Sequence, residues 1–160
     1  MQTITREKVG AGQAAKGAKG FTAGTLLATA DGYLPVEYLD RGDRIITREG
    51  MRKLRMVKVH TYSGPAVTIT GSALGHERPE QAMTLPAHAN LHLRGALAMS
   101  IFRVAEALIP ARWLVDGKKV QATEAMNLRV YELFFDTPQV IYAEGVEVVC
   151  EAMPSLALVA

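Results

Sequence analysis

Three side chains in different parts of the sequence have the clearest capacity for chemistry. His88 follows Leu85-Pro86-Ala87, and its imidazole can accept or donate a proton near neutral pH. Asp136 ends the apolar run Leu133-Phe134-Phe135 and offers a carboxylate. Cys150 is the only cysteine, so the chain has neither an intramolecular disulfide nor a multi-cysteine metal site. The sequence therefore offers acid–base and thiol chemistry without a disulfide framework.

Each candidate also has a structural interpretation. Cys150 lies in an apolar Val-Val-Cys run, which favours a small core residue over a thiol nucleophile. Asp136 can equally cap the turn before Pro138. His92 shares a strand face with Asn90 and does not form a ligand set with His88, so we predict no metal and no cofactor.

Length and composition indicate one globular domain. The chain has 160 residues, 49% of them hydrophobic, and a formal net charge of only +2. The N-terminus lacks the roughly 7 to 15 apolar residues of a secretory signal. No segment approaches the roughly 20 apolar residues of a membrane span. We therefore expect a cytoplasmic protein without a membrane partner, and export that needs no signal remains open.

Residues 1–20 form a basic segment rich in Gly, Ala and Lys. Four basic residues face one acid there, which gives the segment a net charge of +3. Its composition predicts a flexible leader, followed by a single β domain over residues 21–160. Four dispersed basic residues without aromatic neighbours favour a solvated leader over a nucleic-acid contact.

Short apolar runs separated by turn signals predict an all-β domain. Asp31-Gly32 and Glu49-Gly50 each indicate a hairpin. Residues 97–108 fit a helix and a strand equally, and 110–114 fit one helical turn that places Trp113 in the core. Strands are expected over residues 25–29, 33–36, 44–48, 53–62, 66–70, 82–85, 90–93, 130–135, 140–143 and 146–150.

Several of these segments together resemble bacterial Hint domains, the fold shared by inteins and hedgehog C-terminal segments. The resemblance implies a pseudo-two-fold horseshoe of β-hairpins with little helix, and it covers about residues 20 to 151. The segments that carry it are Phe21-Thr22-Ala23-Gly24-Thr25-Leu26-Leu27-Ala28-Thr29, Asp31-Gly32, Pro35-Val36-Glu37-Tyr38-Leu39, Arg41-Gly42-Asp43, Arg48-Glu49-Gly50, Leu85-Pro86-Ala87-His88, Leu108 to Gly117, Tyr131 to Asp136 and Val140 to Gly145.

The resemblance also implies a reaction and its residues. In the family, a cysteine at the position of Gly20 attacks the preceding carbonyl and converts an amide into a thioester. His88 stands where the family has the histidine that protonates the leaving nitrogen, with Leu85 in place of its hydroxyl partner. Asp136 would help to organise the site, although Pro138 replaces a histidine. A cleft where Gly20, His88 and Asp136 converge is therefore expected.

Three functions follow from these departures. The leading hypothesis is a degenerate, non-catalytic Hint domain that acts as a structural or peptide-binding module for a protein or peptide partner. The alternative is a self-cleaving Hint peptidase whose cysteine is replaced by Gly20. The third is a nucleic-acid binder, which rests on the basic leader alone. Splicing is not expected, because splicing inteins end in His-Asn and the last asparagine here is Asn127.

Overall fold

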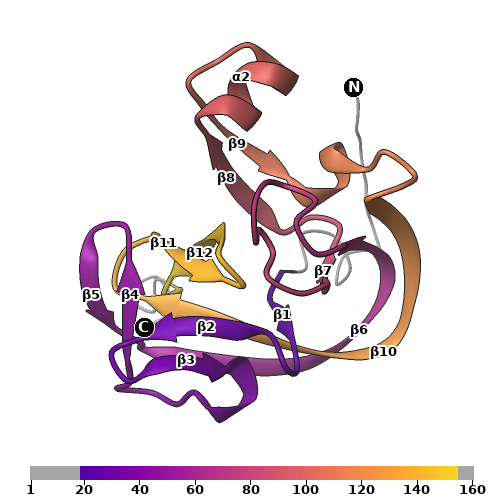
Figure 1. Ribbon diagram of the computed structural model, residues 1–160. Coiled ribbons are helices and arrows are strands. Elements are labelled where there is room, and N and C mark those ends of the chain that lie inside the picture. Colours follow the sequence, from indigo (N-terminus) through magenta and orange to yellow (C-terminus); the bar gives the residue numbers. More distant parts are fainter. Residues whose placement is uncertain (1–18, 155–160) are drawn as a thin grey trace.

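The computed structural model describes residues 19–154, so the predicted leader, except for Lys19 and Gly20, lies outside the described residues. The strands bend around a common core, and β8, α2 and β9 project from it (Figure 1). The predicted all-β architecture with little helix is confirmed. No helix within residues 19–154 has the length and apolar character that a membrane span requires.

The elements, in which η marks a short 3₁₀ turn, follow in chain order. They are β1 (Phe21–Thr22), β2 (Leu26–Thr29), β3 (Gly32–Pro35), η2 (Val36–Tyr38), β4 (Arg44–Thr47), β5 (Gly50–Lys53), β6 (Met56–Ile69), β7 (Met83–Pro86), β8 (Asn90–Arg94), α2 (Ala96–Phe102), β9 (Glu106–Pro110), η3 (Ala111–Leu114), β10 (Val120–Phe135), β11 (Gln139–Ala143) and β12 (Val146–Ala152).

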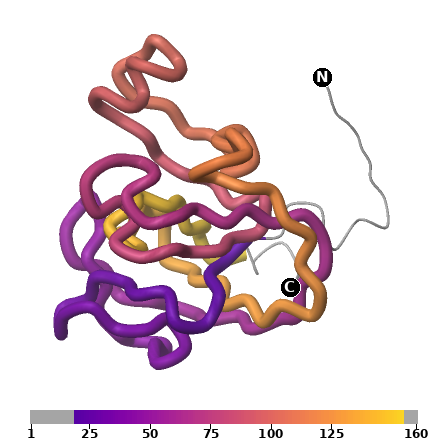
Figure 2. Tube along the Cα trace, turned by 45° about the vertical axis from the view of Figure 1, so that its right-hand side comes forward, coloured from indigo at the N-terminus to yellow at the C-terminus, as the bar shows by residue number. Residues whose placement is uncertain are grey.

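β6 and β10 form a long antiparallel ribbon that curves around the molecule (Figure 2). Their register shifts between Ala125 and Leu128, and a bulge of this kind bends a ribbon. β7 pairs with β6, while β1 and β12 pair with β10. The sequence predicted only residues 130–135 of β10. The first half of the strand is mostly exposed, so it lacks the apolar alternation that marks a strand.

In two hairpins, a threonine hydroxyl makes the same pair of hydrogen bonds across the turn. The Thr29 hydroxyl donates to the Gly32 carbonyl at 2.6 Å and accepts the Asp31 N–H at 3.1 Å. Thr47 makes the same pair of bonds with Gly50 and Glu49, at 2.6 and 3.1 Å. Both hairpins were predicted from their turn sequences, and the threonine bonds satisfy backbone groups that a tight turn leaves unpaired.

A buried carboxylate joins the third hairpin to its neighbours. Glu144 and Gly145 connect β11 to β12 with φ values of 53° and 84°, as a type I′ turn requires. The Glu144 carboxylate accepts the Leu26 N–H at 2.9 Å and the Gln81 amide at 3.3 Å. The turn is therefore fastened both to β2 and to the loop before β7.

Residues 97–108, which fit a helix and a strand equally in sequence, contain parts of both a helix and a strand. α2 occupies 96–102, and β9 follows from 106 to 110 and pairs with β8. The helical turn predicted at 110–114 is present as η3. The core position predicted for Trp113 is wrong: the side chain is 54% exposed and contacts Phe102 with ring centroids 6.3 Å apart.

Candidate functional site

The chain enters the domain in close contact with β10. Phe21 pairs with Tyr131 and Thr22 with Val130, which holds the preceding Gly20 against the same strand. Gly20 has a φ of +125°, and a Cβ built on it would lie 2.4 Å from Val130 Cγ1 and 2.8 Å from the Tyr131 carbonyl oxygen. This position therefore requires glycine, both for its backbone conformation and for the space around it.

A small pocket of about 10 Å³, partly open to solvent, lies beside Gly20. The Lys19 ammonium donates a hydrogen bond of 2.7 Å to the Glu151 carboxylate. Glu132 also lines this pocket, and burial raises its pKa above the usual value, although His60, Lys58 and Lys19 nearby act in the opposite direction. The other lining residues are Phe21, Ala89, Leu133, Val148, Val149 and Cys150.

Glu132 is a site residue that the sequence analysis missed. A signal was available, because an acid interrupts the apolar run Val130 to Phe135 and acids are seldom found inside apolar strands. Perturbed carboxyl groups in pockets are candidates for proton transfer. The pocket thus contains one acid bound to a lysine and one acid that burial shifts toward its neutral form.

His88 borders the same region. It occupies the turn between β7 and β8, and the next residue, Ala89, lines the pocket. Burial lowers the pKa of His88, and the charges of Arg112 and Lys19 lower it further. A neutral imidazole therefore lies within electrostatic reach of Lys19. Leu85 is fully buried in the core, so the residue in the hydroxyl partner's place serves packing.

Asp136 does not join this group. It follows the end of β10, five residues beyond Tyr131, a separation of about 16 Å at the usual strand rise. Its carboxylate is exposed and forms an ion pair of 3.0 Å with Arg55. Pro138 lines a different pocket with Arg48. The structure thus brings Gly20 and His88 to one region and places Asp136 elsewhere.

No alternative nucleophile replaces the missing thiol among the residues around the pocket. Cys150 is 5% exposed, and burial raises its thiol pKa far above the ordinary value. Attack requires the thiolate, which this environment suppresses. The Thr22 hydroxyl lies 3.4 Å from the Thr25 hydroxyl and 3.4 Å from the Thr84 carbonyl oxygen. Neither contact supplies a base.

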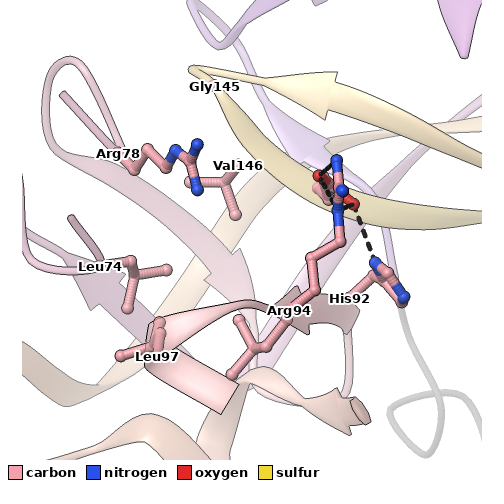
Figure 3. Close-up of a pocket in the computed structure, with 9 residues that line it drawn as sticks. Leu74, Arg78, His92, Arg94, Leu97, Gly145 and Val146 are labelled. Atoms are coloured by element: carbon pink, nitrogen blue, oxygen red, sulfur yellow. Dashed lines mark hydrogen bonds and ion pairs between the residues drawn. The ribbon is translucent and has the colours of Figure 1, made fainter. Parts of the chain in front are cut away.

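A second histidine lies in a separate charged network. His92 is buried, with Nδ1 2.8 Å from Glu147 and Nε2 2.6 Å from Glu106. Arg94 Nε donates to Glu147 at 2.9 Å, and Arg48 lies 3.2 Å from the imidazole. Figure 3 shows His92 and Arg94 at the rim of a pocket whose walls include Leu74, Leu97 and Val146. The carboxylates satisfy both ring nitrogens, which indicates a structural role.

A family model for the Hint domain matches residues 19–153, which confirms the resemblance. No curated protein matches the chain. The bacterial intein-like domain from Clostridium thermocellum is 15% identical over 84% of this chain and 99% of its own, with a TM-score of 0.60. For the TvoVMA intein, the identity is 12%, the coverages are 85% and 99%, and the TM-score is 0.59. These structures show the fold, and it is the predicted Hint fold.

Replacing Gly20 should cost more stability than replacing a glycine of similar backbone conformation in open space. We expect Gly20→Ala to lower the free energy of unfolding by about 1–3 kcal/mol more than Gly24→Ala, because of overpacking against Val130. Gly24 has a φ of +91° and no heavy atom within 4 Å of a built Cβ, so it carries the backbone penalty alone. Urea denaturation measures both variants. Equal losses of stability in the two variants would show that β10 moves readily to make room for a side chain at residue 20.

The His92 network should make stability depend on pH on the acid side. Burial alone would raise the pKa of Glu147, but hydrogen bonds from Arg94 and His92 outweigh burial and lower it. A carboxylate with a lowered folded pKa stabilises the protein above its unfolded value of about 4.3, and this contribution is lost as pH falls through the folded pKa. We expect Glu147→Gln to cost about 1–3 kcal/mol at pH 7.

The difference between wild type and Glu147→Gln should shrink as the pH falls from about 4.3 through the lowered folded pKa, because below that pKa both carry a neutral side chain at this position. Urea titrations at several pH values between neutral and acid measure it. Glu80→Gln is the control, since Glu80 is exposed and its carboxylate bonds no residue in 19–154. A Glu147→Gln difference that stays constant with pH would contradict the network's role.

Proposed function

Since the chain belongs to the Hint domain family, we propose that it is a non-catalytic member whose cleft binds a peptide segment. The environment of Gly20 carries this proposal. A glycine has no atom with which to attack the preceding carbonyl, and the contacts with Val130 and Tyr131 leave no room for a side chain. The reaction that the family begins with a thiol has no starting group here.

The segment held in the cleft indicates which peptide chemistry the site suits. Phe21 and Thr22 pair with β10 as the short strand β1, and addition of a strand is a common way for a sheet edge to bind a peptide. Glu151 contacts the ammonium of Lys19, Gly20 allows close backbone approach, and Phe21 is only 1% exposed. The preferred segment is therefore a basic residue, a glycine and an aromatic residue in succession, and the chain itself provides one.

Self-cleavage is the second candidate, and His88 favours it. Burial, Arg112 and the Lys19 ammonium lower the pKa of His88, and the Lys19 carbonyl would be the acyl group of the scissile peptide bond. A general acid or base can therefore remain at a site that lacks a nucleophile. Supplying a thiol at residue 20 separates the two functions.

Intact mass distinguishes retention from cleavage. The full chain with a tag before Met1 is incubated with and without a thiol, beside Gly20→Cys and the double variant Gly20→Cys/Val130→Ala. The second substitution removes the atom 2.4 Å from the built Cβ. We expect all three proteins to stay whole. Leu85 stands in place of the hydroxyl partner of His88, Asp136 lies away from the pocket, and the Tyr131 carbonyl still restricts the space around residue 20. Release of the leader by either cysteine variant, abolished by adding His88→Ala, would establish self-cleavage instead.

Trypsin measures how firmly the cleft holds the segment, because it cuts after Lys19. An ion pair at this partly exposed position contributes about 0.2–1 kcal/mol. Glu151→Gln should therefore speed cleavage of the bond between Lys19 and Gly20 roughly two- to five-fold. Glu124→Gln, an exposed acid on β10, should leave the rate unchanged. An unchanged rate in Glu151→Gln would show that Glu151 does not hold the segment.

A further inference from the structure

A second pocket lies where β8 and α2, which project from the body as an arm, meet the rest of the molecule (Figures 1 and 3). It has a volume of about 30 Å³ and is partly open to solvent. A space of this size admits an end group as large as a carboxylate, whereas a ring or a sugar does not fit. Within residues 19–154 it shares no lining residue with the pocket beside Gly20, so the two pockets are separate.

Aliphatic side chains form one wall of this pocket. Leu74, Leu93 and Val146 are at most 9% exposed, so the core fixes their positions. Leu97, at the start of α2, is partly buried and packs against the same core. Aliphatic carbon atoms of a ligand would displace water from this wall, which is favourable. The wall therefore suits the apolar part of a small ligand.

Arg94 supplies an oriented cation at the rim of the pocket. Its Nε donates to the Glu147 carboxylate at 2.9 Å, and its Nη2 lies 2.8 Å from Glu147 Oε2. The Glu147 side chain is 11% exposed, so the acid that holds the guanidinium is itself fixed. A guanidinium carries five N–H donors, and this pair leaves those on Nη1 without a partner in residues 19–154. Arg94 can therefore bind Glu147 and a second acceptor together.

Arg78 supplies a second cation from the loop between β6 and β7. Its N–H donates to the Gly75 carbonyl at 3.0 Å, and its own carbonyl accepts the Leu74 N–H at 2.7 Å. Its Cγ lies 4.0 Å from a Cβ built on Gly145, so the side chain rests on the turn between β11 and β12. Figure 3 shows the Arg78 and Arg94 side chains on two sides of the pocket. The loop thus places a guanidinium opposite the arm.

The acids around this pocket are bound to other groups. Glu147 binds Arg94 and His92, and Glu106 lies 2.6 Å from the His92 ring. Glu144, in the turn before Gly145, is 3% exposed and accepts its hydrogen bonds from outside the pocket. Glu77, beside Arg78 in the sequence, lies 3.5 Å from His76. Two arginines and one carboxylate line the pocket, which leaves a net positive charge.

We propose that this pocket binds an aliphatic carboxylate, with the carboxylate between Arg78 and Arg94 and the aliphatic carbon atoms against the leucines and Val146. A guanidinium matches the planar geometry of a carboxylate, and the small volume admits such an end group while the rest of the ligand extends into solvent. The C-terminal residue of a peptide and a free short-chain acid both present this chemistry. The site is independent of whether the cleft beside Gly20 binds or cleaves a peptide.

NMR titration of the full-length protein with isovalerate tests the proposal at neutral pH. We expect saturable shifts of the methyl signals of Leu74, Leu97 and Val146, and binding that weakens as salt is added. Isovaleramide is the matched probe, because it has the same shape without the charge. It should bind roughly five-fold more weakly, since hydrogen bonds to a charged group are the stronger ones.

Removing one guanidinium should weaken binding selectively. Arg78→Gln should lower the affinity for isovalerate roughly two- to five-fold, the range of an ion pair at an exposed position. Arg129→Gln is the control, since Arg129 is an exposed arginine on β10 outside the pocket. N-acetyl-alanyl-valine separates the two sources of the carboxylate. Tighter binding than isovalerate identifies a peptide terminus, and weaker binding identifies a free acid.

Circular dichroism establishes that each variant is folded. Methyl signals of Leu74, Leu97 and Val146 that do not move with either carboxylate would overturn the proposal. Equal affinities for isovalerate and isovaleramide would show that the wall binds apolar groups without selecting a charge, and would overturn it too. So would a folded Arg78→Gln variant that binds isovalerate as tightly as Arg129→Gln does.

Discussion

β10 is the strand on which the site depends, because three other strands pair with it. β6 runs beside it for most of its length, while β1 and β12 pair with its final residues. The entering chain, the pocket and the curved ribbon are thus fixed to one backbone. Since β1 aligns Phe21 with Tyr131, the preceding residue has no freedom to move away from β10. The close contact at Gly20 follows from strand pairing.

Gly20 therefore accounts both for the missing nucleophile and for the close packing against β10. Gly20 lacks a thiol, but it also permits an approach that no other residue allows without displacing Val130 or the Tyr131 carbonyl. Restoring cysteine alone leaves the contact unrelieved. Gly20 is thus part of how β1 packs, and a thiol at that position requires a rearrangement of β10 as well.

The parts of the fold that could be predicted depend on local chemistry. Asp31-Gly32 and Glu49-Gly50 specify tight turns by residue type, so both hairpins were found. The first half of β10 could not be predicted, because pairing along one ribbon stabilises it and its side chains remain exposed. Trp113 was misplaced for the opposite reason: an aromatic residue in an apolar run is expected in a core, and only tertiary structure shows it uncovered.

The site was predictable only where strand order alone determines position. His88 and Gly20 lie near one pocket because β7, β1 and β10 bring them there, whereas Asp136 follows its strand past the pocket. The two histidines show what sequence cannot give. His92 is bound by two carboxylates, while burial lowers the pKa of His88 and two nearby cations lower it further. The region around Gly20 thus combines a histidine of lowered pKa with packing that leaves no room for a side chain at residue 20.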